Sequence, residues 1–207
     1  MTDASGTELS AMQGVLKAAC FAAEKHAAQK RKGAAAEPYV NHLVEVAELV
    51  STALSEPDVN LVVAALLHDS IEDAKVTKEE LANRFSWDVA ELVAEVTDNK
   101  LLEKQERKRL QILNAPHKSV RAQAIKLADF ISNLRSILNS PPADWSLQRK
   151  REYFAWARQV VTGFTAPNLI LKGQFEATCR KFEDLVSQPS QAEPGLCPAP
   201  PSEKPLR

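Results

Sequence analysis

The fold is predicted by the stretch Ala64-Ala65-Leu66-Leu67-His68-Asp69-Ser70-Ile71-Glu72-Asp73, in which an apolar run ends in a group of ionisable side chains. The apolar run starts at Leu61 and follows Pro57-Asp58, a dipeptide that suits the start of a helix. Its alanine and leucine content favours a buried helix over a strand. The stretch therefore predicts a buried helix that ends in charged residues.

The ionisable side chains of this stretch pair one helical turn apart. His68 and Glu72 are four residues apart, and Asp69 and Asp73 repeat that spacing on the adjacent stripe of the helix. Three carboxylates beside an imidazole would repel one another strongly if left bare, and a cation between them removes that penalty. We therefore interpret the stretch as half of a metal site.

Composition sets the broad class of protein. The chain has 207 residues, of which 44% are apolar and 26% charged, as in a soluble globular protein of one domain. A net charge of −1 gives no indication of nucleic acid or membrane binding. Residues 1–10 lack the apolar region of a secretory signal, and no apolar run reaches the ~20 residues of a membrane span. The three widely spaced cysteines, Cys20, Cys179 and Cys197, favour a reducing cytoplasm.

Apolar residues recur at helical spacing along most of the chain, and no segment alternates convincingly like a strand. The predicted fold class is all-α, with about eight or nine helices in one domain over residues 8–186. The predicted helices cover 9–29, 40–54, 57 through the quoted stretch, 77–85, 86–96, 103–113, 119–138, 145–163 and 167–186. Residues 187–207 are rich in proline and cannot bury a core, so they are predicted to be a disordered tail.

Another acidic residue lies in an unfavourable place. Asp129 falls in the middle of the predicted helix 119–138 among apolar neighbours, although aspartate has poor helix propensity. A buried, unpaired aspartate is costly, and metal ligation is one of few remedies. Asn133 lies one turn further along the same face. We therefore expect four residues from three helices to meet around one ion: His42, His68, Asp69 and Asp129.

This donor set indicates both the ion and its chemistry. Two imidazoles and two carboxylates suit a divalent ion such as Mn²⁺, Zn²⁺ or Fe²⁺, and the lack of a thiol argues against a structural zinc site. Two coordination places remain for water and a substrate oxygen, where such an ion acidifies water and polarises a phosphoryl group. Glu72 and Asp73, one turn away, are placed to accept or donate a proton. The alternative is that these carboxylates pair with Lys or Arg on neighbouring helices.

Six local motifs appear in a fixed order along about residues 10–185. They are Pro38-Tyr39-Val40-Asn41-His42, Ala65-Leu66-Leu67-His68-Asp69-Ser70-Ile71-Glu72-Asp73, Val96-Thr97-Asp98, Glu106-Arg107-Lys108-Arg109-Leu110, Lys126-Leu127-Ala128-Asp129 and Glu152-Tyr153-Phe154-Ala155-Trp156-Ala157. Together with the order of the four metal-binding residues, they resemble the HD phosphohydrolase superfamily. Within it, they look like a small alarmone hydrolase, a free-standing relative of the hydrolase domain of the Rel/Spo stringent-response enzymes.

The resemblance implies an HD-domain helical bundle that hydrolyses the 3′-pyrophosphate of guanosine tetra- or pentaphosphate, (p)ppGpp. The products are GDP or GTP and pyrophosphate, and the family commonly uses Mn²⁺. His42, His68, Asp69 and Asp129 fall on its metal ligands, Glu72 and Asp73 on its catalytic acidic pair, and Asn133 on a residue that supports the site. The residues that fall near the nucleotide and its phosphates are Lys25, Arg31, Ser70, Lys104, Arg149 and Tyr153.

The sequence also departs from the family pattern. Leu43 replaces a usual proline, Ser70 a commoner threonine, Asn99 an acidic residue and Phe130 a lysine, so a cation near Asp129 is expected to be lost. Two alternatives stay open: a nucleotide phosphomonoesterase, such as one acting on NADPH, and a non-catalytic nucleotide-binding module, which Phe130 supports. The expected partner is a small-molecule nucleotide, with no nucleic acid or membrane, and the sequence does not distinguish a monomer from a homodimer.

Overall fold

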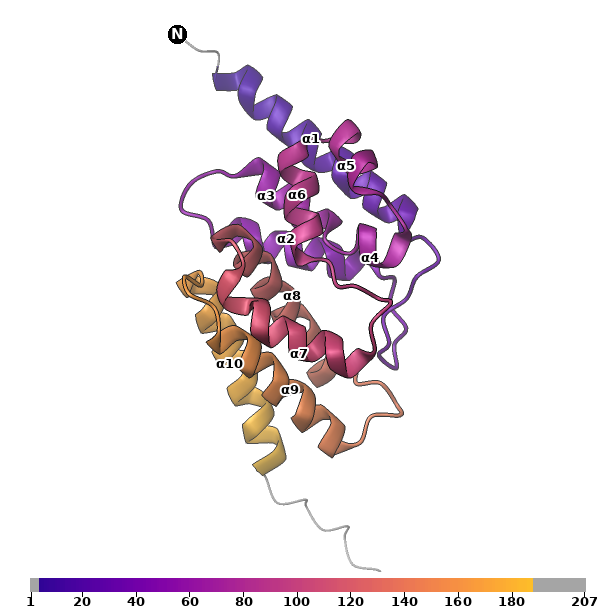
Figure 1. Cartoon of the computed structure of the whole chain (residues 1–207), viewed down its shortest axis with the longest axis vertical. Coiled ribbons are helices and arrows are strands. Elements are labelled where there is room, and N and C mark those ends of the chain that lie inside the picture. Colours follow the sequence, from indigo (N-terminus) through magenta and orange to yellow (C-terminus); the bar gives the residue numbers. More distant parts are fainter. Residues whose placement is uncertain (1–3, 188–207) are drawn as a thin grey trace, which may run out of the picture.

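The computed structural model describes residues 4–187, which form ten α-helices and one short 3-10 helix (Figure 1). The elements are α1 (Ala4–Lys25), α2 (Val40–Thr52), α3 (Val59–Leu67), α4 (Ser70–Ala74), α5 (Lys78–Arg84), α6 (Trp87–Val96), α7 (Lys104–Asn114), η1 (Ala115–His117), α8 (Val120–Asn139), α9 (Leu147–Thr162) and α10 (Leu169–Ser187). The all-α prediction is confirmed over these residues. None of their helices has both the length and the apolar character of a membrane span.

The predicted boundary of the tail falls at the end of the last helix. Ser187, predicted as the first residue of the tail, is the last residue of α10. The rest of the predicted tail, residues 188–207, lies outside the described residues, as does Cys197. At the other end, α1 already begins at Ala4, five residues before the predicted start.

Side-chain caps explain why several helices begin where the sequence predicts. The carboxylate of Asp58 accepts a hydrogen bond from the backbone N–H of Leu61 at the start of α3. The side chains that cap α5, α6, α8 and α9 in the same way are Thr77, Ser86, Ser119 and Ser146. Each cap satisfies one N–H group that the first turn of a helix leaves unpaired. Local chemistry therefore sets these helix starts.

The predicted third helix is divided in two at the quoted stretch. α3 ends at Leu67 and α4 begins at Ser70, because Asp69 has φ −98° and ψ 0°, outside the regular helical range. α4 ends at Ala74, followed by Lys75 in the left-handed conformation, with φ 58°. The break places His68 and Asp69 between two helices, near the centre of the protein.

α8 forms the middle of the core. Figure 1 shows it between the N-terminal helices and α9 and α10, and it packs against α2, α3, α6, α9 and α10. Every residue from 122 to 132 is buried. Asp129 therefore lies inside the protein, as the sequence predicts.

The loop between α1 and α2 is held against the loop between α8 and α9. Gly33 approaches Ser140 so closely that a Cβ atom would collide with the Ser140 carbonyl group, so this position suits only glycine. The backbone N–H of Ala34 donates to the Pro141 carbonyl at 3.3 Å. This contact brings Arg31 near α8, where its guanidinium donates to Asn133 Oδ1 at 3.1 Å.

Candidate active site

The four predicted metal ligands converge from three parts of the fold. His42 comes from α2, His68 and Asp69 from the break between α3 and α4, and Asp129 from α8. His42 Nε2 lies 3.7 Å from Asp69 Oδ2 and 3.4 Å from Asp129 Oδ1. His68 Nε2 lies 3.1 Å and 3.9 Å from the same two oxygen atoms. These separations suit ligands that each lie about 2.1 Å from one central ion.

Both imidazoles turn their Nε2 atom toward this centre. His68 Nδ1 donates to the Ala65 carbonyl at 2.8 Å. His42 Nδ1 lies 2.8 Å from Ser132 Oγ. The hydroxyl of Ser132 donates its only hydrogen to Glu45 Oε2 at 2.6 Å, so its oxygen accepts a hydrogen bond from the imidazole. Each Nδ1 therefore carries a proton, and each Nε2 is buried with no hydrogen-bond partner.

The two carboxylates are held in place by neighbouring polar groups. Asp129 Oδ2 accepts from Lys126 Nζ at 3.1 Å, and Asp129 Oδ1 accepts from Asn133 Nδ2 at 2.5 Å. Asp69 Oδ2 accepts from the Tyr39 hydroxyl at 2.5 Å. Burial would raise the pKa of Asp129, but the ammonium of Lys126 and the two imidazoles hold it far below its usual range. Asp129 is therefore ionised and ready to bind a cation.

The surroundings of the imidazoles also favour a positive charge in the centre. Burial would lower the pKa of His68, but the carboxylates of Asp69 and Asp129 raise it to about 9. Burial lowers the pKa of His42, which therefore stays neutral. Two buried, unpartnered Nε2 atoms facing two carboxylates fit a divalent ion, which would replace the proton on His68.

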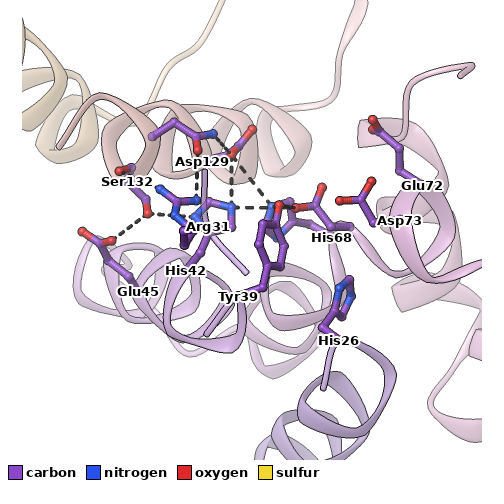
Figure 2. A network of polar contacts seen from close by, with 12 residues as sticks. His26, Arg31, Tyr39, His42, Glu45, His68, Glu72, Asp73, Asp129 and Ser132 are labelled. Atoms are coloured by element: carbon purple, nitrogen blue, oxygen red, sulfur yellow. Dashed lines mark hydrogen bonds and ion pairs between the residues drawn. The ribbon is translucent and has the colours of Figure 1, made fainter. Parts of the chain in front are cut away.

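The acidic pair lies beside this centre rather than within it. Figure 2 shows Glu72 and Asp73 to one side of His68, away from Ser132 and Glu45. Glu72 Oε2 accepts from the backbone N–H of Asp98 at 3.2 Å, and burial followed by the charge of Asp69 raises the pKa of Glu72.

Cations also surround the acidic pair. Glu72 Oε1 lies 3.7 Å from Arg107 and 3.8 Å from Lys100. Asp73 binds Lys100 and accepts from Gln29 Nε2 at 2.8 Å. Pairing with Lys and Arg, the alternative drawn from the sequence, therefore occurs together with a position next to the His/Asp centre.

A cavity of about 370 Å³ opens onto the acidic pair. Its basic lining residues are Lys30, Arg31, Lys32, Lys100, Lys104 and Arg107, against the two acidic residues Glu72 and Asp73. Its aromatic lining residues are Tyr39, Trp145 and Tyr153, and Asn133 also borders it. Six basic and two acidic side chains give this cavity an excess of positive charge, and two of its aromatic rings, Trp145 and Tyr153, have centroids 5.5 Å apart.

Three residues predicted near the substrate do not line this cavity. Lys25 pairs with Glu80 at 3.3 Å, and Ser70 Oγ is buried without a hydrogen-bond partner. The guanidinium of Arg149 lies 4.5 Å from the centroid of Trp145, so this residue contacts the aromatic wall of the cavity. Roles for these three side chains in binding stay predictions.

Several residues of the site are not among the predicted site residues. They are Gln29, Tyr39, Glu45, Lys100, Arg107, Lys126, Trp145 and Ser132. Tyr39 and Lys126 fall within quoted motifs, and their proximity to a metal-binding residue could have singled them out. Glu45 and Ser132 gave no signal, because they are 87 residues apart in the chain.

The expected loss of a cation near Asp129 is wrong. Lys126, one turn before Asp129, supplies an ammonium group to it, and the attraction of Asp129 keeps the pKa of this buried lysine above its usual value. Phe130 is buried in the core, where its ring packs edge-on against Trp156 and Phe175. Its replacement of a charged residue is therefore a matter of packing.

Known proteins resemble this chain over most of its length. A family model described as an HD domain matches residues 18–155. The chain is 48% identical over 162 residues to guanosine-3′,5′-bis(diphosphate) 3′-pyrophosphohydrolase MESH1 of Xenopus tropicalis, covering 78% of this chain and 90% of that protein. It is 46% identical over 154 residues to the protein of the same name from Homo sapiens, covering 74% of this chain and 86% of that protein.

A solved structure shares the fold. It is described as a metazoan ortholog of SpoT that hydrolyzes ppGpp and plays a role in starvation responses. It matches with a TM-score of 0.77 and 42% sequence identity, over 81% of this chain and 94% of that chain. These similarities agree with the resemblance carried by the sequence motifs.

Proposed function

Because this chain belongs to the HD-domain family, we propose that it is a guanosine-3′,5′-bis(diphosphate) 3′-pyrophosphohydrolase. It hydrolyses the 3′-pyrophosphate of (p)ppGpp to GDP or GTP and pyrophosphate, and so acts in alarmone turnover. One observation carries the proposal: the acidic pair lines a cavity that is rich in basic residues, together with Tyr39 and Asn133, which bind the carboxylates of Asp69 and Asp129. Such a cavity suits a substrate that bears several phosphate groups.

The ion proposed for the centre is Mn²⁺, with Zn²⁺ or Fe²⁺ as alternatives. His42, His68, Asp69 and Asp129 would hold it. When bound, such an ion polarises a phosphoryl oxygen and makes water more acidic. Tyr39 and Asn133 fix the orientation of the two carboxylates through their hydrogen bonds to Asp69 and Asp129.

The acidic pair is proposed to move the proton of the reaction. Water attacks the 3′-phosphorus, the bond from that phosphorus to the ribose 3′-oxygen breaks, and the proton of the water ends on the 3′-oxygen. Glu72, whose pKa is raised, accepts that proton and passes it on, and Asp73 borders the same space. Asn133 would help to hold the reacting group, because it borders both the cavity and Asp129.

The cavity is proposed to bind the nucleotide through its charge and its aromatic wall. Arg31, Lys104 and the other basic side chains would bind phosphate groups, and Lys104 has a lowered pKa because of burial and nearby cations. Tyr153 and Trp145 offer flat surfaces for the base or ribose. Arg149 would act through its contact with Trp145.

The binding-module alternative has lost its support, because Phe130 is a core residue and Asp129 keeps a cation. The partner is a small-molecule nucleotide, bound without nucleic acid or membrane by a monomer or homodimer. We place the enzyme in the cytoplasm, and the free thiols of Cys20 and Cys179 support that placement.

A substrate panel tests the proposed function. Purified protein is incubated with Mn²⁺ and ppGpp, and the release of GDP and pyrophosphate is followed. We expect turnover that the variant Asp69→Ala lacks, with a higher kcat/KM for ppGpp than for NADPH. Turnover of NADPH or another phosphate ester without turnover of ppGpp would reject the proposal in favour of a phosphomonoesterase.

A further inference from the structure

We propose that Ser132 and Glu45 are positioning residues that orient the imidazole of His42 and thereby set the affinity of the centre for its metal ion. The inference deepens the proposed function and rests on it, since it concerns the same metal centre. It gives a role to two residues outside the ligands, the acidic pair and the nucleotide cavity.

The three side chains form one chain of hydrogen bonds (Figure 2). His42 Nδ1 donates to Ser132 Oγ at 2.8 Å, and Ser132 Oγ donates to Glu45 Oε2 at 2.6 Å. The other carboxylate oxygen of Glu45 accepts from Arg135 Nη1 at 3.2 Å, and Arg135 Nη2 donates to Gln174 Oε1 at 2.9 Å. The chain thus runs from the buried His42 to the partly exposed Glu45 and Arg135.

The direction of these bonds decides which nitrogen of His42 faces the ion. Glu45 can only accept from Ser132, because an ionised carboxylate has no hydrogen to donate. The hydroxyl of Ser132 must then accept from His42, which places the imidazole proton on Nδ1 and leaves the Nε2 lone pair toward Asp69 and Asp129. A partner of this kind fixes the tautomer and ring orientation of a metal-binding histidine.

The second imidazole of the centre is supported differently. His68 Nδ1 donates to the backbone carbonyl of Ala65, within its own helical turn. That support does not depend on a side chain. His42 instead depends on α8 for Ser132, and on its own helix for Glu45. The orientation of His42 is therefore the one that a side-chain substitution can change.

Space beside this chain allows a conservative test. A second cavity of about 160 Å³ is lined by His42, Glu45, Ser132 and Arg135. A threonine at position 132 keeps the hydroxyl and adds one methyl group beside this cavity. Ser132→Thr should therefore keep the bond to His42, whereas Ser132→Ala removes it.

The test measures Mn²⁺ binding to metal-free protein by titration calorimetry, without substrate. We expect Ser132→Ala to weaken Mn²⁺ binding by about 10- to 100-fold and Glu45→Ala to weaken it in the same direction. Ser132→Thr should restore affinity to near that of the wild type. The matched control is Glu48→Ala, an exposed glutamate on the same helix, which should bind Mn²⁺ like the wild type.

A double variant separates a hydrogen-bonded chain from two independent effects. If Glu45 acts through Ser132, adding Glu45→Ala to Ser132→Ala should weaken binding no further. Additive losses, or wild-type affinity in both single variants, would overturn the proposal. If circular dichroism shows that Ser132→Ala does not fold, the Mn²⁺ affinities of Glu45→Ala and Glu48→Ala are compared instead, together with that of Ser132→Thr. A loss of affinity in Glu45→Ala alone supports the proposal, and equal affinities in Glu45→Ala and Glu48→Ala overturn it.

The result is separable from the test of the proposed function. Wild-type protein that binds Mn²⁺ and hydrolyses ppGpp, with no change of affinity in Ser132→Ala, would reject the positioning role alone. Wild-type protein that binds none of Mn²⁺, Zn²⁺ and Fe²⁺ would reject the metal centre and the positioning role together.

Discussion

Glu72 lies on the border between the buried His/Asp centre and the open cavity. Its side chain is partly buried, and its Oε2 atom is fixed by the backbone N–H of Asp98. Burial and the nearby charge of Asp69 raise the pKa of Glu72. A carboxylate with a raised pKa is a better base near neutral pH than an exposed one. At the scale of single residues, this is the side chain on which the proposed proton transfer depends most.

Replacing Glu72 with glutamine should therefore lower kcat by about 10²- to 10⁴-fold, because the amide cannot accept a proton. In the wild type, kcat/KM should fall as the pH decreases through the raised pKa of Glu72, above the ordinary value of about 4.3. Initial rates of GDP release across a range of pH measure both effects.

The matched control for this change is Glu79→Gln, on an exposed position of α5. It should leave kcat and the pH profile unchanged. A Glu72→Gln variant with wild-type kcat, or with an unchanged acid limb, would show that another group accepts the proton.

At the scale of helices, Arg121 joins the starts of three of them. Its guanidinium lies on α8 and binds Asp58, the N-cap of α3, and Asp88, in the first turn of α6. Asp58 also accepts from Leu61 N–H, so one carboxylate serves both the start of α3 and its contact with α8. Hydrogen bonds from Arg121 lower the pKa of Asp88. This network helps to position α3, which carries His68 at its end.

Arg121→Ala should lower the free energy of unfolding by about 1 kcal/mol at neutral pH, a modest loss because the side chains are partly exposed. The stabilisation from Asp88 is fully present above its unfolded pKa of about 3.9 and is lost as the pH falls through its lower folded pKa. The difference between wild type and variant should therefore be smaller at about pH 3.5 than at pH 7.

Urea denaturation at the two pH values measures this difference. Arg109→Ala is the matched control, since Arg109 is exposed and, among the described residues, pairs only with Glu106, three residues earlier on α7. It should change the free energy of unfolding by less than about 0.5 kcal/mol. An equal loss in both variants would show that Arg121 has no special role in joining the helices.

At the scale of the whole molecule, the His/Asp centre connects the N-terminal helices to the middle of the core. Its side chains come from α2, from the break between α3 and α4, and from α8. Since α8 also packs against α9 and α10, an ion bound there would stabilise contacts between both halves of the described chain (Figure 1). Metal binding and global stability should therefore be coupled.

Adding Mn²⁺ to metal-free protein at about 100 times its Kd should raise the free energy of unfolding by about 2.7 kcal/mol. The same addition should have little effect on Asp69→Asn, which keeps the shape of the side chain but loses its charge. Thermal unfolding with Mn²⁺ and with EDTA measures the difference. A rise in Tm of equal size in Asp69→Asn would place the ion elsewhere.

The sequence alone determined the all-α class and most helix starts, because apolar spacing and side-chain caps such as Asp58 are local properties. It also identified His42, His68, Asp69 and Asp129 as residues that meet. A polar or charged side chain in an apolar helix is costly to bury without a partner, and this cost can be recognised from the sequence before the partner is known. The acidic pair was visible for the same reason, since it follows a buried run by one turn.

Only the tertiary structure decided which other side chains surround these residues. The break at Asp69 depends on packing as well as on helix propensity, and the sequence predicted a continuous helix there. Lys126 and Lys100 are lysines among many in the sequence, and only the fold places one on Asp129 and the other on Asp73. Ser132 and Glu45 meet across 87 residues, and nothing in their local sequence encodes the contact, because the directions of their side chains are set by how α8 packs on α2.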